Sequence, residues 1–101
     1  METVTLTAEN GDKREVTARK VAGGLAITPT LEHDKHRGKY RLTHVRSGLG
    51  FGYFKNLPTA HKALVAVLAL PIDWTADKDT IATPENGHRV HEAIENADGD
   101  R

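Results

Sequence analysis

The residues best suited to chemistry lie in one stretch of the chain that carries only positive charge. Between Asp34 and Asp73 there is no acidic residue, but there are seven basic ones: Lys35, Arg37, Lys39, Arg41, Arg46, Lys55 and Lys62. Four aromatic residues are interleaved with them, Tyr40, Phe51, Tyr53 and Phe54. Basic side chains neutralise phosphates and aromatic rings stack on bases, so this pattern is typical of a surface that contacts nucleic acid.

The charge of the whole chain hides this stretch. The net charge is zero, but residues 1–62 hold eleven Lys and Arg against six Asp and Glu, whereas residues 63–101 hold three against eight. The first part is therefore at +5 and the second at −5. A solvated basic face and a solvated acidic tail would also give this division. The sharper interpretation is a basic binding face with an acidic segment that competes for that face or discourages loose binding.

The elements that position these residues follow from hydrophobic periodicity and turn residues. Strands are expected at 3–7, 14–21, 25–31, 39–46 and 49–54, with a helix as the alternative at 14–21. Pro29 suggests that its strand lies at a sheet edge. Asn56 and Pro58 begin a buried helix that ends before Pro71. The sequence thus predicts an α+β fold: an antiparallel sheet of about five strands, one buried helix packed on it, and a short acidic C-terminal helix from Thr83.

Alternation along residues 39–46 separates two faces of that strand. Tyr40, Leu42 and His44 point to one side, and Lys39, Arg41, Thr43 and Val45 to the other. The second face carries the charge, so the prediction of nucleic-acid binding depends on whether this face is open to solvent. We expect His44 to be a core or partly exposed histidine.

The end of this unit resembles a known family. Phe51-Gly52-Tyr53-Phe54, followed by Ala60 and Ala63, is similar to the end of the three-stranded-sheet DNA-binding domains of plant ethylene-response factors and of the arm-binding domains of phage tyrosine recombinases. The resemblance covers about residues 39–70. It implies a sheet that lies in the major groove of DNA with one helix packed behind it. It also implies that Lys39, Arg41 and Thr43 face the DNA, with Arg46 at the hairpin turn.

From the basic stretch and the resemblance together, we predict a small non-enzymatic DNA-binding accessory or regulatory module of phage or mobile-element type. The residues predicted to contact nucleic acid are Lys35, Arg37, Lys39, Arg41, Thr43, Arg46 and Lys55. The alternatives are an adaptor or inhibitor that binds an acidic protein surface, and a protein that sequesters an anionic small molecule. The glycines and aromatics of residues 48–54 also resemble the ribonucleoprotein motif of RNA-recognition domains. The alternative is that the glycines only make room for the helix against the sheet.

The sequence gives weaker indications of metal binding or catalysis. His88 and Glu92 lie one helical turn apart, but no third metal ligand accompanies them. Ser47 lies in a hairpin turn without the setting of a catalytic nucleophile, and no carboxylate pair lies near an apolar segment. We therefore expect no metal, cofactor or catalytic residue.

Chain length, cysteine content and apolar runs indicate where the protein is located and how many domains it has. The chain has 101 residues and no cysteine, and it has no apolar run of the roughly 20 residues that a membrane span needs. No secretory signal is visible near the first residue. We expect a cytoplasmic protein with no membrane partner, with one domain over residues 1–74 and an acidic connector with a C-terminal helix over residues 75–101.

Overall fold

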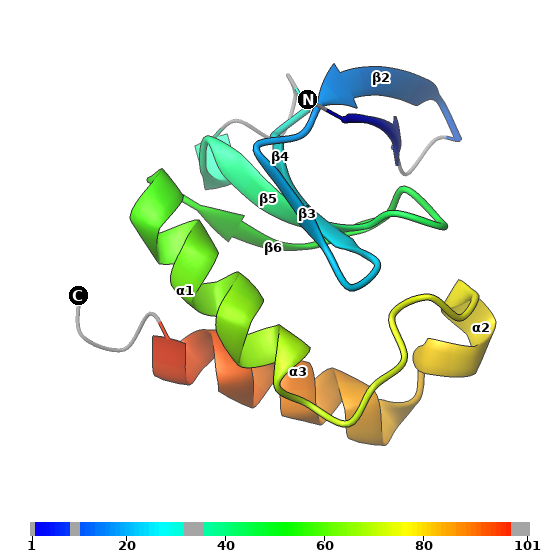
Figure 1. Ribbon diagram of the computed structural model, residues 1–101, viewed down its shortest axis with the longest axis vertical. Coiled ribbons are helices and arrows are strands. Elements are labelled where there is room, and N and C mark those ends of the chain that lie inside the picture. Colours follow the sequence, from blue (N-terminus) through cyan, green and yellow to red (C-terminus); the bar gives the residue numbers. More distant parts are fainter. Residues whose placement is uncertain (1, 9–10, 32–35, 98–101) are drawn as a thin grey trace.

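A computed structural model of the chain describes residues 2–8, 11–31 and 36–97 and confirms the α+β class (Figure 1). The strands are β1 (Thr3–Thr7), β2 (Lys13–Thr17), β3 (Lys20–Ala22), β4 (Leu25–Pro29), β5 (Tyr40–His44) and β6 (Gly50–Phe54). The helices are α1 (Leu57–Leu68), α2 (Lys78–Ile81) and α3 (Pro84–Ala97). No helix in these described ranges is long and apolar enough to cross a membrane.

The first two strands form the expected hairpin. β1 and β2 pair in antiparallel fashion, with Thr3 opposite Thr17 and Thr7 opposite Lys13. Alternation buries Val4 and Leu6 and leaves the residues between them exposed. The helix considered for residues 14–21 is not formed, because the chain continues through β2 and a bend into β3 instead.

The other four strands form a second antiparallel sheet in the order β3-β4-β5-β6. β4 is therefore an inner strand, and the expectation that Pro29 marks a sheet edge is wrong for the strand as a whole. β3 pairs only with Leu25–Ile27, so Pro29 lies beyond its end and has a strand neighbour on one side only, opposite Tyr40. A missing backbone N–H is tolerated at such a position.

Helix α1 covers one face of this sheet as expected. The Asn56 side chain accepts a hydrogen bond from the backbone N–H of Thr59 at 2.9 Å and caps the helix, and Pro58 lies in its first turn. Ala60, Ala63, Leu64 and Val67 are buried on the stripe that faces the sheet. They join Leu25, Ile27, Leu42 and Phe54 in the main core.

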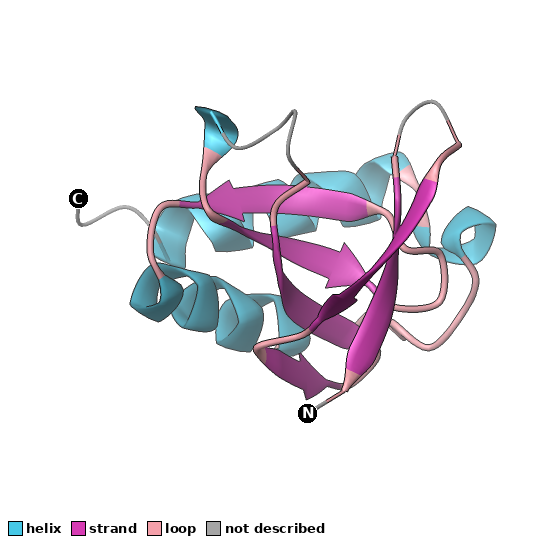
Figure 2. Cartoon of the chain, turned by 90° about the horizontal axis from the view of Figure 1, so that it is seen from above, coloured by secondary structure: helices cyan, strands magenta, loops and turns pink. Residues whose placement is uncertain are grey.

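The hairpin covers the opposite face of the sheet. Val4 and Leu6 pack with Ala18, Ala26 and Leu31 in a second hydrophobic cluster. Figure 2 shows the hairpin crossing the sheet on one side with the long helices on the other. The sheet is thus buried on both faces, and three layers result: hairpin, sheet and helices.

Helix α3 packs against α1 (Figure 1). Four apolar residues of α3 pack against the main core, although none of them is fully buried: Val90, Ala93, Ile94 and Ala97. The acidic C-terminal helix is therefore part of the helical layer.

Glycine substitutions test how the hairpin is held on the sheet. Gly48 has φ +75°, and a Cβ there would lie 2.5 Å from the carbonyl oxygen of Thr5 in β1. Gly48→Ala should lower the free energy of unfolding by at least about 2 kcal/mol, because it adds a backbone clash to the cost of a left-handed conformation. Urea unfolding measures this change.

Two matched variants separate the contributions. Gly11 also has a positive φ, +90°, but a Cβ there would meet nothing within 4 Å, so Gly11→Ala should cost only about 1 kcal/mol. Gly87 lies inside α3 with open space around it, and Gly87→Ala should stabilise the protein by up to about 1 kcal/mol. Equal losses for Gly48→Ala and Gly11→Ala would contradict close packing of β1 on the β5–β6 turn.

Candidate ligand-binding cleft

The structure buries two of the residues that were predicted to face DNA. Arg41 is 2% exposed and Thr43 is 0% exposed, because the β1–β2 hairpin covers their face of the sheet. This face is therefore covered at its centre, and Arg41 and Thr43 do not reach solvent. The side-chain periodicity was right, but charge in the sequence does not reveal which layer covers a strand.

The buried arginine has partners inside the protein. Its Nη2 donates to the carbonyl oxygen of Gly48 at 2.7 Å, and its Nε donates to the hydroxyl of Thr43 at 3.1 Å. The hydroxyls of Thr43 and Thr28 lie 2.9 Å apart. Gly50 gives the guanidinium its space, since a Cβ there would lie 2.8 Å from Cζ of Arg41. Arg41 thus joins β5 to the β5–β6 turn from inside the protein.

The other predicted contact residues are divided between two ends of the sheet. Arg37, Lys39 and Lys55 are exposed at the end where β5 begins and β6 ends, and we call these three the basic corner. The guanidinium of Arg37 lies 5.3 Å from the ring centroid of Tyr53. Arg46 lies at the other end of β5 and donates to the carbonyl oxygen of Thr75 at 3.0 Å. Lys35 lies outside the described residues.

A different feature dominates the helix side of the molecule: an apolar cleft of about 680 Å³. It lies between β6, the β5–β6 turn and the segment that runs from Trp74 through α2 into α3. Phe51, Trp74, Ile81, Val90 and Ile94 supply its apolar lining. His44, Ser47, Asn86 and His91 are among its polar lining residues.

Two stacked aromatic rings line the cleft. The rings of Phe51 and Trp74 are nearly parallel, at 2°, with centroids 5.3 Å apart. Phe51 is half-buried and Trp74 is 6% exposed. The indole Nε1 of Trp74 is buried and finds no hydrogen-bond acceptor within residues 2–8, 11–31 and 36–97. Such an unpaired N–H costs about 1–3 kcal/mol, and functional sites are one place where this cost is tolerated.

A histidine and a serine lie at the β5–β6 end of the cleft. His44 is 5% exposed, and its Nδ1 lies 2.8 Å from Oγ of Ser47. Its Nε2 lies 2.9 Å from the carbonyl oxygen of Trp74 and 3.0 Å from that of Ala76. Carbonyl oxygens only accept, so Nε2 carries the proton of the neutral ring. In this neutral form Nδ1 is an acceptor, and the Ser47 hydroxyl donates to it.

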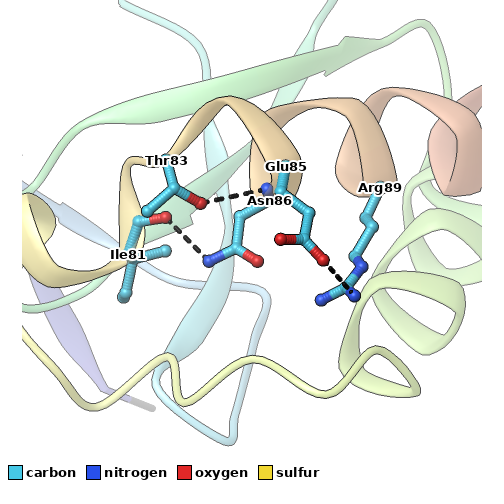
Figure 3. A network of polar contacts seen from close by, with 5 residues as sticks. All are labelled: Ile81, Thr83, Glu85, Asn86 and Arg89. Carbon is cyan, nitrogen blue, oxygen red and sulfur yellow. Dashed lines mark hydrogen bonds and ion pairs between the residues drawn. The ribbon is translucent and has the colours of Figure 1, made fainter.

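The α2–α3 segment that lines the cleft is fixed by local hydrogen bonds (Figure 3). Thr83 Oγ1 accepts from the backbone N–H of Asn86 at 3.1 Å, and the Asn86 side chain donates to the carbonyl oxygen of Ile81 at 2.9 Å. Arg89 and Glu85 form an ion pair one turn further along α3. These contacts hold the connection between the two helices in one arrangement.

The turn before α2 is held by two carboxylates. The hydroxyl and then the backbone N–H of Thr75 donate to Asp73 and lower the pKa of its carboxyl below 3.8. The backbone N–H of Thr80 donates to Asp77 at 2.8 Å and lowers the pKa of that carboxyl in the same direction, with smaller contributions from Arg46 and His44. Both carboxylates are thus bound in their ionised form.

Comparison with known proteins gives no match. No family model, no curated protein and no solved structure matches this chain. The resemblance of residues 39–70 to three-stranded-sheet DNA-binding domains therefore stays a prediction from sequence. The function has to be argued from the cleft and the basic corner themselves.

The cleft could not be predicted from sequence, because the residues that line it come from segments far apart in the chain. The one local signal was that His44 and Ser47 flank a tight turn, which places their side chains within reach of each other. On the last helix His88 pairs with Glu92, as its spacing suggested, and His91 pairs with Glu95 in the same way; both pairs are exposed, at 3.4 Å. No group of three or more His, Cys, Asp or Glu with metal-site geometry occurs among the described residues.

The two lowered pKa values predict acid sensitivity around the cleft. A carboxyl whose folded pKa is depressed contributes stability above its unfolded pKa, near 3.8, and loses it as the pH falls through the folded value. The wild-type protein should therefore lose more unfolding free energy between about pH 5 and pH 2 than the double variant Asp73→Asn, Asp77→Asn, which keeps the acceptor oxygens but does not titrate. Identical pH profiles from urea unfolding of the two proteins would contradict this.

Proposed function

We propose that this protein binds a small, largely apolar molecule that carries a planar ring and a hydrogen-bond acceptor. The cleft volume of about 680 Å³ lies within the roughly 300–1,000 Å³ typical of small-molecule sites, and its lining is mostly apolar with a few polar groups. The observation that carries the proposal is the Phe51–Trp74 stack, which lines the cleft and contains an unpaired indole N–H.

Each feature of the proposed ligand is complementary to particular residues of the cleft. A planar ring fits beside the half-buried face of Phe51, since aromatic rings favour parallel offset stacking. Apolar substituents would contact Ile81, Val90 and Ile94, which are only partly buried without a ligand. Nε1 of Trp74 is buried in the free protein, so an acceptor that reaches it requires a shift of neighbouring groups and would then remove the cost of the unpaired N–H. Burial of the apolar lining then supplies most of the affinity.

A matched pair of probes tests this proposal. Indanone carries a carbonyl on a planar bicyclic frame, and indane has the same frame without the acceptor. Trp74 is the one tryptophan in the chain, so its indole N–H gives a single signal in a 1H–15N NMR spectrum. Indanone should shift this signal and bind about fivefold more tightly than indane, because a new hydrogen bond contributes about 1 kcal/mol.

Two variants with the same substitution locate the binding. Val90 lines the cleft, so Val90→Phe should fill it and weaken indanone binding at least about tenfold. Val65 is an exposed apolar residue on α1, at 68% exposure, outside this cleft, and Val65→Phe should leave binding unchanged. Equal effects of the two variants, or a Trp74 signal that neither probe moves, would overturn the proposal.

Nucleic-acid binding is a second candidate function, and the basic corner favours it. Lys39 and Lys55 lie on neighbouring chain segments at the same end of the sheet, because each is next to a member of the Tyr40–Phe54 pair. Arg37 lies over the ring of Tyr53 at the same end. Cations beside an aromatic ring form the arrangement by which proteins hold phosphates and stack bases.

Reversing the charge of the lysines in the basic corner tests nucleic-acid binding separately from small-molecule binding. The double variant Lys39→Glu, Lys55→Glu should weaken binding to a random DNA duplex and lower the slope of log affinity against log salt by about 2, one contact for each lysine. Arg46→Glu, at the other end of β5, is the control and should change the slope less. Fluorescence anisotropy at low salt measures both. The candidate fails if the wild-type protein does not bind, or if Arg46→Glu has the larger effect.

A further inference from the structure

The Ser47–His44 pair has the hydrogen-bond pattern of an activated nucleophile. The two carbonyl oxygens at Nε2 fix the ring in the tautomer that leaves Nδ1 free to take a proton. Ser47 Oγ is 2.8 Å from that nitrogen, within the range for a nucleophile and its general base. The same carbonyl oxygens still accept from Nε2 when the proton is transferred, because Nε2 keeps its N–H in the imidazolium.

The serine oxygen also has a donor of its own. The backbone N–H of Leu49 donates to Ser47 Oγ at 3.2 Å. A hydrogen bond from a backbone N–H stabilises the negative charge that develops on an oxygen as it loses its proton. Ser47 Oγ therefore accepts from Leu49, which holds the oxygen in place, and donates to His44, which can take its proton.

We infer that Ser47 is a covalent acyl-acceptor site, which takes an apolar acyl group from an activated carboxylic ester. Oγ of Ser47 would attack the ester carbonyl carbon, and Nδ1 of His44 would take the hydroxyl proton. The C–O bond to the leaving alcohol then breaks, and the alcohol departs with a proton from the imidazolium or as its free anion. Ser47 then carries the acyl group as an ester, and no oxidant or reductant is consumed.

The surroundings of Ser47 select the kind of acyl group. Ser47 and His44 line the same cleft as Phe51, Trp74 and Leu49, so the acyl chain would enter an apolar space. Partial exclusion of water strengthens the contacts of His44 with its carbonyl partners. This inference concerns reaction at Ser47 and stands apart from reversible binding of a ring at Phe51 and Trp74.

The chain is well suited to a direct test, because Ser47 is its one serine and it has no cysteine. The intact protein is incubated with p-nitrophenyl butyrate. Release of p-nitrophenolate and intact mass are followed together, and peptide mapping locates the butyryl group. The expected result is a burst of about one nitrophenolate per protein and one butyryl group on Ser47, as the kinetics of an acyl intermediate require.

Two substitutions make the test decisive. Ser47→Ala should abolish the burst and leave only slow acylation of lysines. His44→Gln keeps a side-chain amide that can bond to the Trp74 and Ala76 carbonyl oxygens, but it removes the base, so acylation of Ser47 should slow by about 100-fold or more. The near-ultraviolet circular dichroism of Trp74 verifies that each variant keeps the cleft.

The contrary outcomes are equally clear. A wild-type protein that gains no butyryl group at Ser47 overturns the inference. So does a His44→Gln variant that is folded and acylates as fast as the wild type. If butyrylation is found at Ser47 but indanone fails to shift the Trp74 signal, this inference stands and the proposed reversible function fails.

Discussion

The burial of β5 on both faces is the constraint on which the rest of the structure depends. Four of its five residues are buried; three of these are polar, and two of the three, Arg41 and His44, point to opposite layers. Buried polar groups must find partners, or each costs about 1–3 kcal/mol. Both find them at the β5–β6 turn: Arg41 at the carbonyl oxygen of Gly48 and His44 at the hydroxyl of Ser47. The hairpin layer is tied to the same turn by Thr7, whose backbone N–H donates to the carbonyl oxygen of Gly48 and whose hydroxyl donates to that of Ser47, both at 2.9 Å.

The position of the cleft follows from these bonds. His44 also bonds to the carbonyl oxygens of Trp74 and Ala76, which brings the segment after α1 back to the turn. Trp74 then stacks on Phe51, and the chain has to pass through α2 before α3 can return to α1. Helix α3 approaches β6 closely at Ile94, where a Cβ on Gly52 would lie 3.2 Å from its Cδ1. The space between that contact and the Trp74 segment is the cleft.

Sequence patterns predicted the elements well because each depends on local features. The Asn56 cap, the apolar stripe of α1, the β1–β2 hairpin and the last helix after Thr83 all have the expected places. The faces of β5 were also separated correctly. What local patterns do not contain is the placement of the hairpin over Arg41 and Thr43, which depends on contacts between residues about 40 apart, such as Thr7 with Ser47 and Gly48. The candidate cleft was invisible for the same reason, since its walls come from residues 44–52 and 74–94.

Ser47 shows how a structural and a chemical role can be told apart at one atom. Its oxygen accepts from the backbone N–H of Leu49, which closes the turn, and the side chains of Asp or Asn would supply the same acceptor. The turn therefore requires an oxygen but not a hydroxyl proton. The proton is used in the second contact, to Nδ1 of His44, and the carbonyl oxygens of Trp74 and Ala76 fix the tautomer that receives it. Closure of the turn accounts for the first of these contacts, whereas the second is the arrangement that proton transfer requires.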